Sequence, residues 1–161
     1  MTINFRRLTT ADLPQLRQFL IDYWGGEEII AHGTSYRPEQ LEGFVVENDN
    51  EWVGLATFFI KDNECEITSL DSLREGKGIG TMLIDKAIEE ARTRDCKRLF
   101  LITTNDNLHA LGFYQKRGFQ IVTVHRGAVN ESRKMKPSIP LVGMNGIPLR
   151  DEIELEMVLK V

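Results

Sequence analysis

Apolar positions in the first third of the chain follow a strand pattern and then a helix pattern. Residues 3–8 alternate loosely between apolar and polar side chains, which predicts a strand. Apolar side chains then recur at steps of three and four residues, which predicts an amphipathic helix, at Leu13, Leu16, Phe19, Leu20 and Tyr23. A pair of glycines at 25–26 ends this helix. A polar loop that contains His32 and Tyr36 follows, and Pro38 then opens a short second helix.

The middle of the chain predicts three strands and a glycine-rich turn. Residues 44–47 and 51–61 are rich in β-branched and aromatic side chains and flank Asn48-Asp49-Asn50, which predicts a hairpin. Residues 64–70 predict the next strand, and a glycine-rich turn follows it. The helix after this turn has one apolar side, formed by Ile79, Met82, Leu83, Ala87, Ile88 and Ala91.

Strand and helix patterns alternate in the last third of the chain. Residues 98–103 and 119–124 predict strands, and the helix between them begins at Asn107 and ends at Gly118. The segment 127–150 is long for a loop, and such loops are usually functional or disordered. We expect a final strand with Ile153, Leu155, Met157, Leu159 and Val161 on one face and Glu152, Glu154, Glu156 and Lys160 mostly on the other.

This order of elements predicts an α/β or α+β domain with a mixed sheet. The 161 residues fit one domain, and 42% hydrophobic residues can bury a core without disulfides or a metal. The formal net charge of -4 argues against nucleic-acid binding, which needs a basic surface, but it suits a cationic small substrate.

The remaining composition predicts a cytoplasmic protein. Cys65 and Cys96 do not make a disulfide framework, so we expect two reduced thiols in the core. The three histidines and two cysteines are scattered without ligand spacing, so no metal site is expected. No signal peptide or membrane span is expected, since the first ten residues lack a following apolar run and no apolar stretch approaches ~18 residues.

The strongest local signal is the turn Arg74-Glu75-Gly76-Lys77-Gly78-Ile79-Gly80-Thr81 between a strand and a helix. Helix N-termini present unpaired amides, and glycines let a phosphate approach them closely, so the turn is a candidate pyrophosphate cradle. A P-loop would need Gly-Lys-Ser/Thr at its end, which is absent. A dinucleotide fingerprint would need a third glycine at position 81 and a parallel sheet, whereas this turn follows an antiparallel meander.

A second segment lies about thirty residues downstream and runs Asn107-Leu108-His109-Ala110-Leu111-Gly112-Phe113-Tyr114-Gln115-Lys116-Arg117-Gly118-Phe119. Together the two segments resemble the GNAT superfamily of acyl-CoA N-acyltransferases. That family has an Arg/Gln-x-x-Gly-x-Gly/Ala turn after its fourth strand and a later Asn-x-x-Ala-x-x-Phe-Tyr-x-x-x-Gly-Phe motif. The resemblance covers residues 44–125 well, and the order of elements covers the whole chain.

The resemblance implies one N-acetyltransferase domain over residues 1–161, with a mixed, mostly antiparallel sheet of about seven strands flanked by about four helices. It implies that acetyl-CoA lies between the fourth and fifth strands, bound by Leu70, Ser72, Glu75, Gly76, Lys77, Gly78, Ile79, Gly80, Thr81, Asn107 and Tyr114. Glu75 stands where the family has Arg or Gln. A carboxylate facing pyrophosphate would be repulsive, so we expect its side chain to point to solvent. Lys77, Lys116 and Arg117 are candidate cations for the phosphates, or else solvated surface charges.

The resemblance also implies direct acetyl transfer to a primary amine without an acyl-enzyme. Tyr114 would be the general acid that protonates the departing thiolate, since a phenol keeps its proton at neutral pH. An amide near Leu70 would stabilise the oxyanion. The base would be Glu66 or Glu64, which share a face of the fourth strand, with His32 as another candidate.

The acceptor is left open. It is a small-molecule amine or a protein amine, and the family takes its specificity from segments that correspond here to 25–38 and 127–150. Arg133, Lys134 and Lys136 are more readily a solvated surface face, or else could meet an acceptor carboxylate or the phosphates of CoA, while Asp151, Glu152 and Glu154 could attract an amine. Edge strands of this family often pair, so a homodimer is possible. The alternatives are a non-catalytic acyl-CoA-binding regulatory module and a transferase for a larger acyl-CoA.

Overall fold

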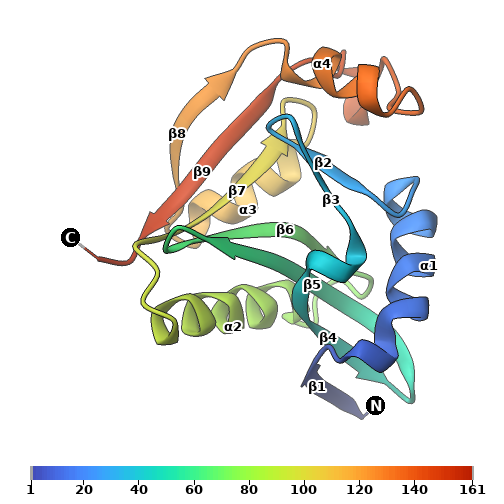
Figure 1. Ribbon diagram of the computed structural model, residues 1–161, viewed down its shortest axis with the longest axis vertical. Coiled ribbons are helices and arrows are strands. Elements are labelled where there is room, and N and C mark those ends of the chain that lie inside the picture. The colour runs from blue at the N-terminus through green and yellow to red at the C-terminus, as the bar shows by residue number, and fades with distance from the viewer. Residues whose placement is uncertain (1, 161) are drawn as a thin grey trace.

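The computed structural model describes residues 2–160 and contains one large sheet beside a small hairpin (Figure 1). Every neighbouring pair of strands in the large sheet is antiparallel except β6 and β7, which are parallel. The strands in spatial order are β1 (Ile3–Arg7), β4 (Glu42–Asn48), β5 (Glu51–Lys61), β6 (Glu64–Ser72), β7 (Arg98–Thr104), β9 (Glu152–Val158) and β8 (Gln120–His125). This arrangement confirms the predicted mixed, mostly antiparallel sheet.

Helices flank the sheet as the order of elements predicts. The α-helices among the described residues are α1 (Leu13–Trp24), α2 (Ile79–Thr93), α3 (Leu108–Lys116) and α4 (Ala128–Met135). Single 3₁₀ turns are found at Thr10–Asp12, at Pro38–Gln40, where a short helix was expected, and at Met144–Gly146. No helix in residues 2–160 is long and apolar enough to span a membrane.

The core has two parts, one for each side of the sheet. On one side α2 contributes Leu83, Ile84 and Ala87, each at most 1% exposed, and these pack against β4–β7. On the other side α1 packs Leu16, Phe19 and Leu20 on Val45, Trp52 and Leu55. Both cysteines are free and fully buried, as expected from the sequence.

The segment expected to be a polar loop after α1 contains a small hairpin instead. It is formed by β2 (Ile29–Ala31) and β3 (Thr34–Tyr36), which pair around a turn at His32 and Gly33 with φ of 43° and 76°. Ile29, Ala31 and Tyr36 are buried, so each strand has one inward face. Three-residue strands give too short an alternation to be recognised in the sequence. The hairpin leans over the sheet near β6 (Figure 1).

The predicted long loop 127–150 contains α4, so its expected lack of structure is wrong. Gly127 begins this helix, and only Val129 and Ser132 on it are buried. Arg133 then donates hydrogen bonds to the carbonyl oxygens of Ile139, Pro140 and Leu149, which folds the segment after α4 back on the helix. A helix that buries one apolar side chain leaves almost no periodic signal in the sequence.

The last strand also differs from its prediction. Glu152, expected on the polar face, is only 3% exposed. Its two carboxylate oxygens accept hydrogen bonds from the backbone N–H of His32 at 3.1 and 3.4 Å, which compensates for this burial. A buried carboxylate needs such partners. The strand ends at Val158, and the predicted apolar position Val161 lies outside the described residues.

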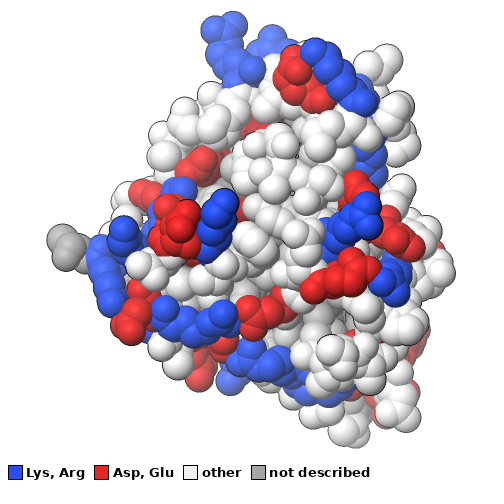
Figure 2. Space-filling view, in the orientation of Figure 1, with Lys and Arg blue, Asp and Glu red and all other residues white. Residues whose placement is uncertain are grey.

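Charged side chains of both signs are interspersed over the face drawn in Figure 2, without a broad basic area on that face. This distribution agrees with the acidic net charge of -4.

We predict that Gly54→Ala destabilises the fold. A Cβ at this position on β5 would lie 2.5 Å from Ile79 Cγ2 and 3.3 Å from Leu83 Cδ1, so α2 would have to move off the sheet. Overpacking of this kind costs about 1–3 kcal/mol, measurable by urea unfolding. Gly112→Ala in α3 is the matched control, because nothing lies within 4 Å of its added Cβ and alanine favours helices. Equal stabilities of the two variants would contradict the proposed contact.

Candidate active site

The two parallel strands β6 and β7 separate part of the way along the sheet. They pair from Glu64 with Arg98 to Ile67 with Leu101, yet β6 continues to Ser72 and β7 to Thr104. Beyond Ile67 the main chain of β6 therefore faces a gap on this side. Free main-chain groups at a gap of strand width can bind an extended ligand as an added strand.

A β-bulge accompanies the separation. Thr57 pairs with Ser69 while Phe58 pairs with Ile67, so Thr68 is an extra residue on β6. The hydroxyls of these buried polar residues satisfy one another, because Thr57 Oγ1 lies 2.7 Å from Thr68 Oγ1 and 2.6 Å from Ser69 Oγ. A bulge increases the local twist and bends its strand, which accounts for the departure of β6 from β7.

The gap is a cavity of about 330 Å³, which we call the strand cleft. Tyr23 and Trp24 of α1 line it from one side of the sheet, and Ala110 and Tyr114 of α3 line it from the other. A second hollow of about 400 Å³ shares several of these walls and extends to Ser72 and Gly80. The two cavities therefore form a continuous path from the last paired residues of β6 towards the glycine-rich turn.

The glycine-rich turn lies at the far end of this path. Gly76 and Gly78 have φ of 72° and 71°, which L side chains rarely adopt, and α2 begins at Ile79. Gly80 packs against α3, since an added Cβ would lie 3.2 Å from Phe113 Cζ. The side chain of Glu75 is exposed, as expected. The first amides of α2 have no intrahelical acceptor and can bind an anion.

Two other predicted ligands of CoA have structural contacts. The side chain of Asn107 caps α3 by accepting a hydrogen bond from the N–H of Ala110 at 3.1 Å, and it also lines both cavities. Arg117 is bound to Thr81 Oγ1 at 2.8 Å and lies over the ring of Phe113 at 3.7 Å. Its guanidinium therefore joins α3 to α2, while Lys77 and Lys116 are exposed.

Tyr114 and Asp71 lie together at the strand cleft. Tyr114 is 8% exposed, and burial together with the charge of Asp71 raises the pKa of its hydroxyl. The phenol thus stays protonated at neutral pH. Burial also raises the pKa of Asp71 to about 6, partly offset by a hydrogen bond from Trp24 Nε1 at 2.9 Å.

A further cavity of about 330 Å³ lies between the β2–β3 hairpin and the sheet, and we call it the hairpin pocket. Glu66 on β6 and Phe100 on β7 line the hairpin pocket, and the residues that follow them, Ile67 and Leu101, line the strand cleft. The other walls of the hairpin pocket include His32, Tyr36, Phe59 and Glu64.

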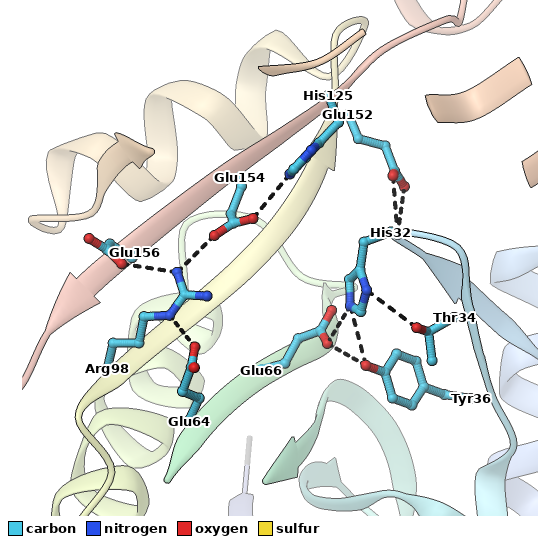
Figure 3. A network of polar contacts seen from close by, with 10 residues as sticks. All are labelled: His32, Thr34, Tyr36, Glu64, Glu66, Arg98, His125, Glu152, Glu154 and Glu156. Carbon is cyan, nitrogen blue, oxygen red and sulfur yellow. Dashed lines mark hydrogen bonds and ion pairs between the residues drawn. The ribbon is translucent and has the colours of Figure 1, made fainter. Parts of the chain in front are cut away.

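Glu66 is the buried carboxylate of the hairpin pocket. It is 2% exposed, and its Oε1 accepts a hydrogen bond from the hydroxyl of Tyr36 at 2.5 Å and lies 2.8 Å from His32 Nε2 (Figure 3). The hydrogen bond to Glu66 raises the pKa of His32, although burial partly opposes this. Within residues 2–160, Glu66 Oε2 has no hydrogen-bond partner.

Glu64 has a different environment, although it shares a face with Glu66. Its carboxylate is bound by Arg98, whose guanidinium also contacts Glu154 at 2.7 Å and Glu156 at 2.9 Å (Figure 3). Glu64 is therefore part of a surface ion-pair network, whereas Glu66 is a buried carboxylate with one free oxygen.

The sequence placed Tyr36 only within the predicted acceptor segment 25–38, without a role, and it did not identify Asp71 or Trp24 as site residues. Asp71 carried a usable signal, because it is an acidic residue at the end of a predicted strand that leads into the glycine-rich turn. Trp24 carried none, since only the folded chain brings the end of α1 to β6.

Comparison with known proteins assigns the family. Residues 9–119 match the model of the acetyltransferase (GNAT) family. The chain is also 44% identical over 151 residues to the uncharacterized protein YxbD of Bacillus subtilis, with 92% of this chain and 95% of that protein covered. The chain therefore belongs to the GNAT acetyltransferase family, as the glycine-rich turn and the motif at residues 107–119 predict.

Two further similarities concern proteins with more informative descriptions. A GNAT acetyltransferase of Elizabethkingia anophelis, solved with acetyl-CoA bound, superposes with a TM-score of 0.72 at 24% identity, over 98% of each chain. The spermine/spermidine N(1)-acetyltransferase of Bacillus subtilis is 35% identical over 75 residues, which are 46% of this chain and 43% of that protein.

We predict that Asp71 titrates near pH 6 and that Trp24→Phe raises its pKa further. The indole N–H stabilises the charged carboxylate, so its loss favours the protonated form. Carboxyl carbon NMR titration of both proteins measures the two values. The same pKa in both would show that the indole hydrogen bond does not form in solution.

Proposed function

We propose that the protein is an N-acetyltransferase that moves the acetyl group of acetyl-CoA directly to a primary amine. The observation that carries this proposal is that two cavities are lined by successive residues of β6 and β7, at the point where the pairing of these strands ends. One cavity has a protonated Tyr114 in its wall, and the other has the buried carboxylate of Glu66. A donor and an acceptor bound in the two cavities would meet at this point.

The strand cleft and the glycine-rich turn suit the shape and charge of acetyl-CoA. Pantetheine is an extended chain with amide groups, and the unpaired part of β6 near Leu70 offers it main-chain partners, with Asn107 on the opposite wall. The amides at Gly76–Thr81 would bind the pyrophosphate through backbone groups, so the exposed Glu75 side chain does not interfere. The acetyl-CoA bound to the Elizabethkingia relative supports this use of the fold.

Tyr114 would protonate the sulfur of the departing CoA. Acetyl transfer breaks the C–S bond, and the thiolate formed has an ordinary pKa near 8.5, below that of the phenol. The raised pKa of Tyr114 keeps the proton on its hydroxyl until negative charge develops on the sulfur.

Glu66 would take the proton from the amine. An alkylamine with a pKa near 10.4 is neutral in only about one molecule in 10³ at pH 7, and only the neutral nitrogen attacks a thioester. The contacts of Tyr36 and His32 are both made to Oε1, so Oε2 makes no competing hydrogen bond and would take the proton directly or through a water molecule. The partial relative that acetylates spermine and spermidine supports an amine as the acceptor.

The proposal is tested by titrating acetyl-CoA into the protein by calorimetry and then measuring thiol release with a panel of amines. We expect saturable binding that weakens when the cradle is filled by Gly78→Val, and thiol release that depends on an amine. Binding without release with any amine would favour a regulatory module, and a longer acyl-CoA series would test a larger donor. The absence of any binding would sink the proposal.

We predict that Glu66→Gln lowers kcat by a factor on the order of 10² or more, the size of a general-base contribution. Glu64→Gln is the matched control on the same face of β6. It removes one of three carboxylates around Arg98 and should change kcat by less than about tenfold. Steady-state kinetics with one amine and saturating acetyl-CoA compares the two. A larger loss in Glu64→Gln would assign the base to Glu64 instead.

A further inference from the structure

Four aromatic rings follow one another around the hairpin pocket. The ring centroids of Phe100 and His32 are 6.4 Å apart, those of His32 and Tyr36 are 6.1 Å apart, and those of Tyr36 and Phe59 are 5.2 Å apart. All four residues line the pocket. They come from β7, the hairpin and β5, which are distant in sequence, so this arc of rings is produced only by the folded chain.

The carboxylate of Glu66 lies within the same pocket. Tyr36 and His32 both engage Oε1, and Oε2 is buried without a partner among residues 2–160. A buried carboxylate is costly unless positive charge lies near it, and a cation held in the adjoining pocket would supply that charge. Aromatic rings attract cations through their π-systems when the cation lies within about 6 Å of the ring centroid.

We propose that the hairpin pocket is an ammonium-binding site that holds the acceptor in its protonated form, against the rings of Tyr36 and Phe59 and beside the carboxylate of Glu66 in the pocket wall. This inference rests on the proposed function for the identity of the ligand as the acceptor. The favoured acceptor is a primary alkylamine with an apolar chain, since aromatic rings form much of the wall and the cavity of about 330 Å³ can hold a small molecule. Carboxylate-bearing amines are disfavoured by Glu66 and Glu64 in its walls.

Such a site recognises the positive charge of its ligand and does not require that the ligand can react. A quaternary ammonium ion therefore fits it, but has neither a proton to give to Glu66 nor a lone pair to attack the thioester. Quaternary ammonium ions are thus expected to be competitive inhibitors against the amine. An uncharged molecule of the same shape is expected to bind poorly.

The charge of His32 sets the pH dependence of this binding. His32 faces Glu66 from β6, Glu152 from β9 and the hydroxyl of Tyr36 from β3, and Lys61 also lines the pocket. The pKa of His32 is raised above its ordinary value, chiefly by the hydrogen bond to Glu66. Below this pKa the imidazolium repels a cationic ligand, so binding of a permanently charged ammonium ion should strengthen as the pH rises through it.

The test uses choline and its uncharged isostere 3,3-dimethyl-1-butanol as probes of the whole protein, by calorimetry with CoA present. We expect choline to bind more tightly than the isostere. Phe59→Leu keeps an apolar side chain but removes a ring, and it should lower the affinity for choline roughly three- to thirtyfold. The affinity of this variant for the uncharged isostere should be the same as that of the unaltered protein. Phe59 is chosen over Phe100 because the guanidinium of Arg98 already lies 4.1 Å from the Phe100 ring.

The control variant is Phe5→Leu, which removes a ring on β1 that stacks on Phe44 outside the pocket. It should bind choline as the unaltered protein does. Equal affinity for choline and the isostere, or equal weakening of both probes by Phe59→Leu, would overturn the ammonium site. These readouts measure binding, so they are independent of whether the protein turns over any amine. Amine-dependent thiol release that choline does not inhibit would overturn the site while leaving the acetyltransferase intact.

Discussion

The separation of β6 from β7 after Ile67 is the constraint on which the rest of the site depends. Parallel strands that stayed paired would satisfy their main-chain groups and leave no gap in the sheet. The bulge at Thr68 bends β6 away, and the buried hydroxyls of Thr57 and Ser69 bond with that of Thr68 where it does so. The strand cleft and the free main chain near Leu70 follow from this one irregularity.

Burial of charge organises the other side of the sheet. Glu66 and Glu152 are each at most 3% exposed, and the hairpin supplies partners to both of them. Tyr36 and the ring of His32 contact Glu66, while the backbone N–H of His32 is donated to Glu152. A carboxylate removed from water requires such partners, so the two glutamates and the hairpin stabilise one another.

The sequence failed at two segments, for the same physical reason. The hairpin at 29–36 and the helix α4 each bury very few apolar side chains, so neither produces a periodic pattern of useful length. Their structure is set by contacts with distant residues, such as Glu152 for the hairpin. Long elements with a full buried face, such as α2 and β5, were predicted to within a few residues.

The sequence by itself determined the features that depend on local spacing. These are the glycine-rich turn before α2, the cap at Asn107, the placement of Tyr114 on the next helix, and the shared face of Glu64 and Glu66. Only the tertiary structure decided how those residues differ. Arg98 forms an ion pair with Glu64, whereas the hairpin buries Glu66 and leaves its Oε2 without a hydrogen-bond partner. Spacing along a chain fixes which face a side chain is on, but charge, burial and partners depend on elements that arrive from elsewhere in the fold.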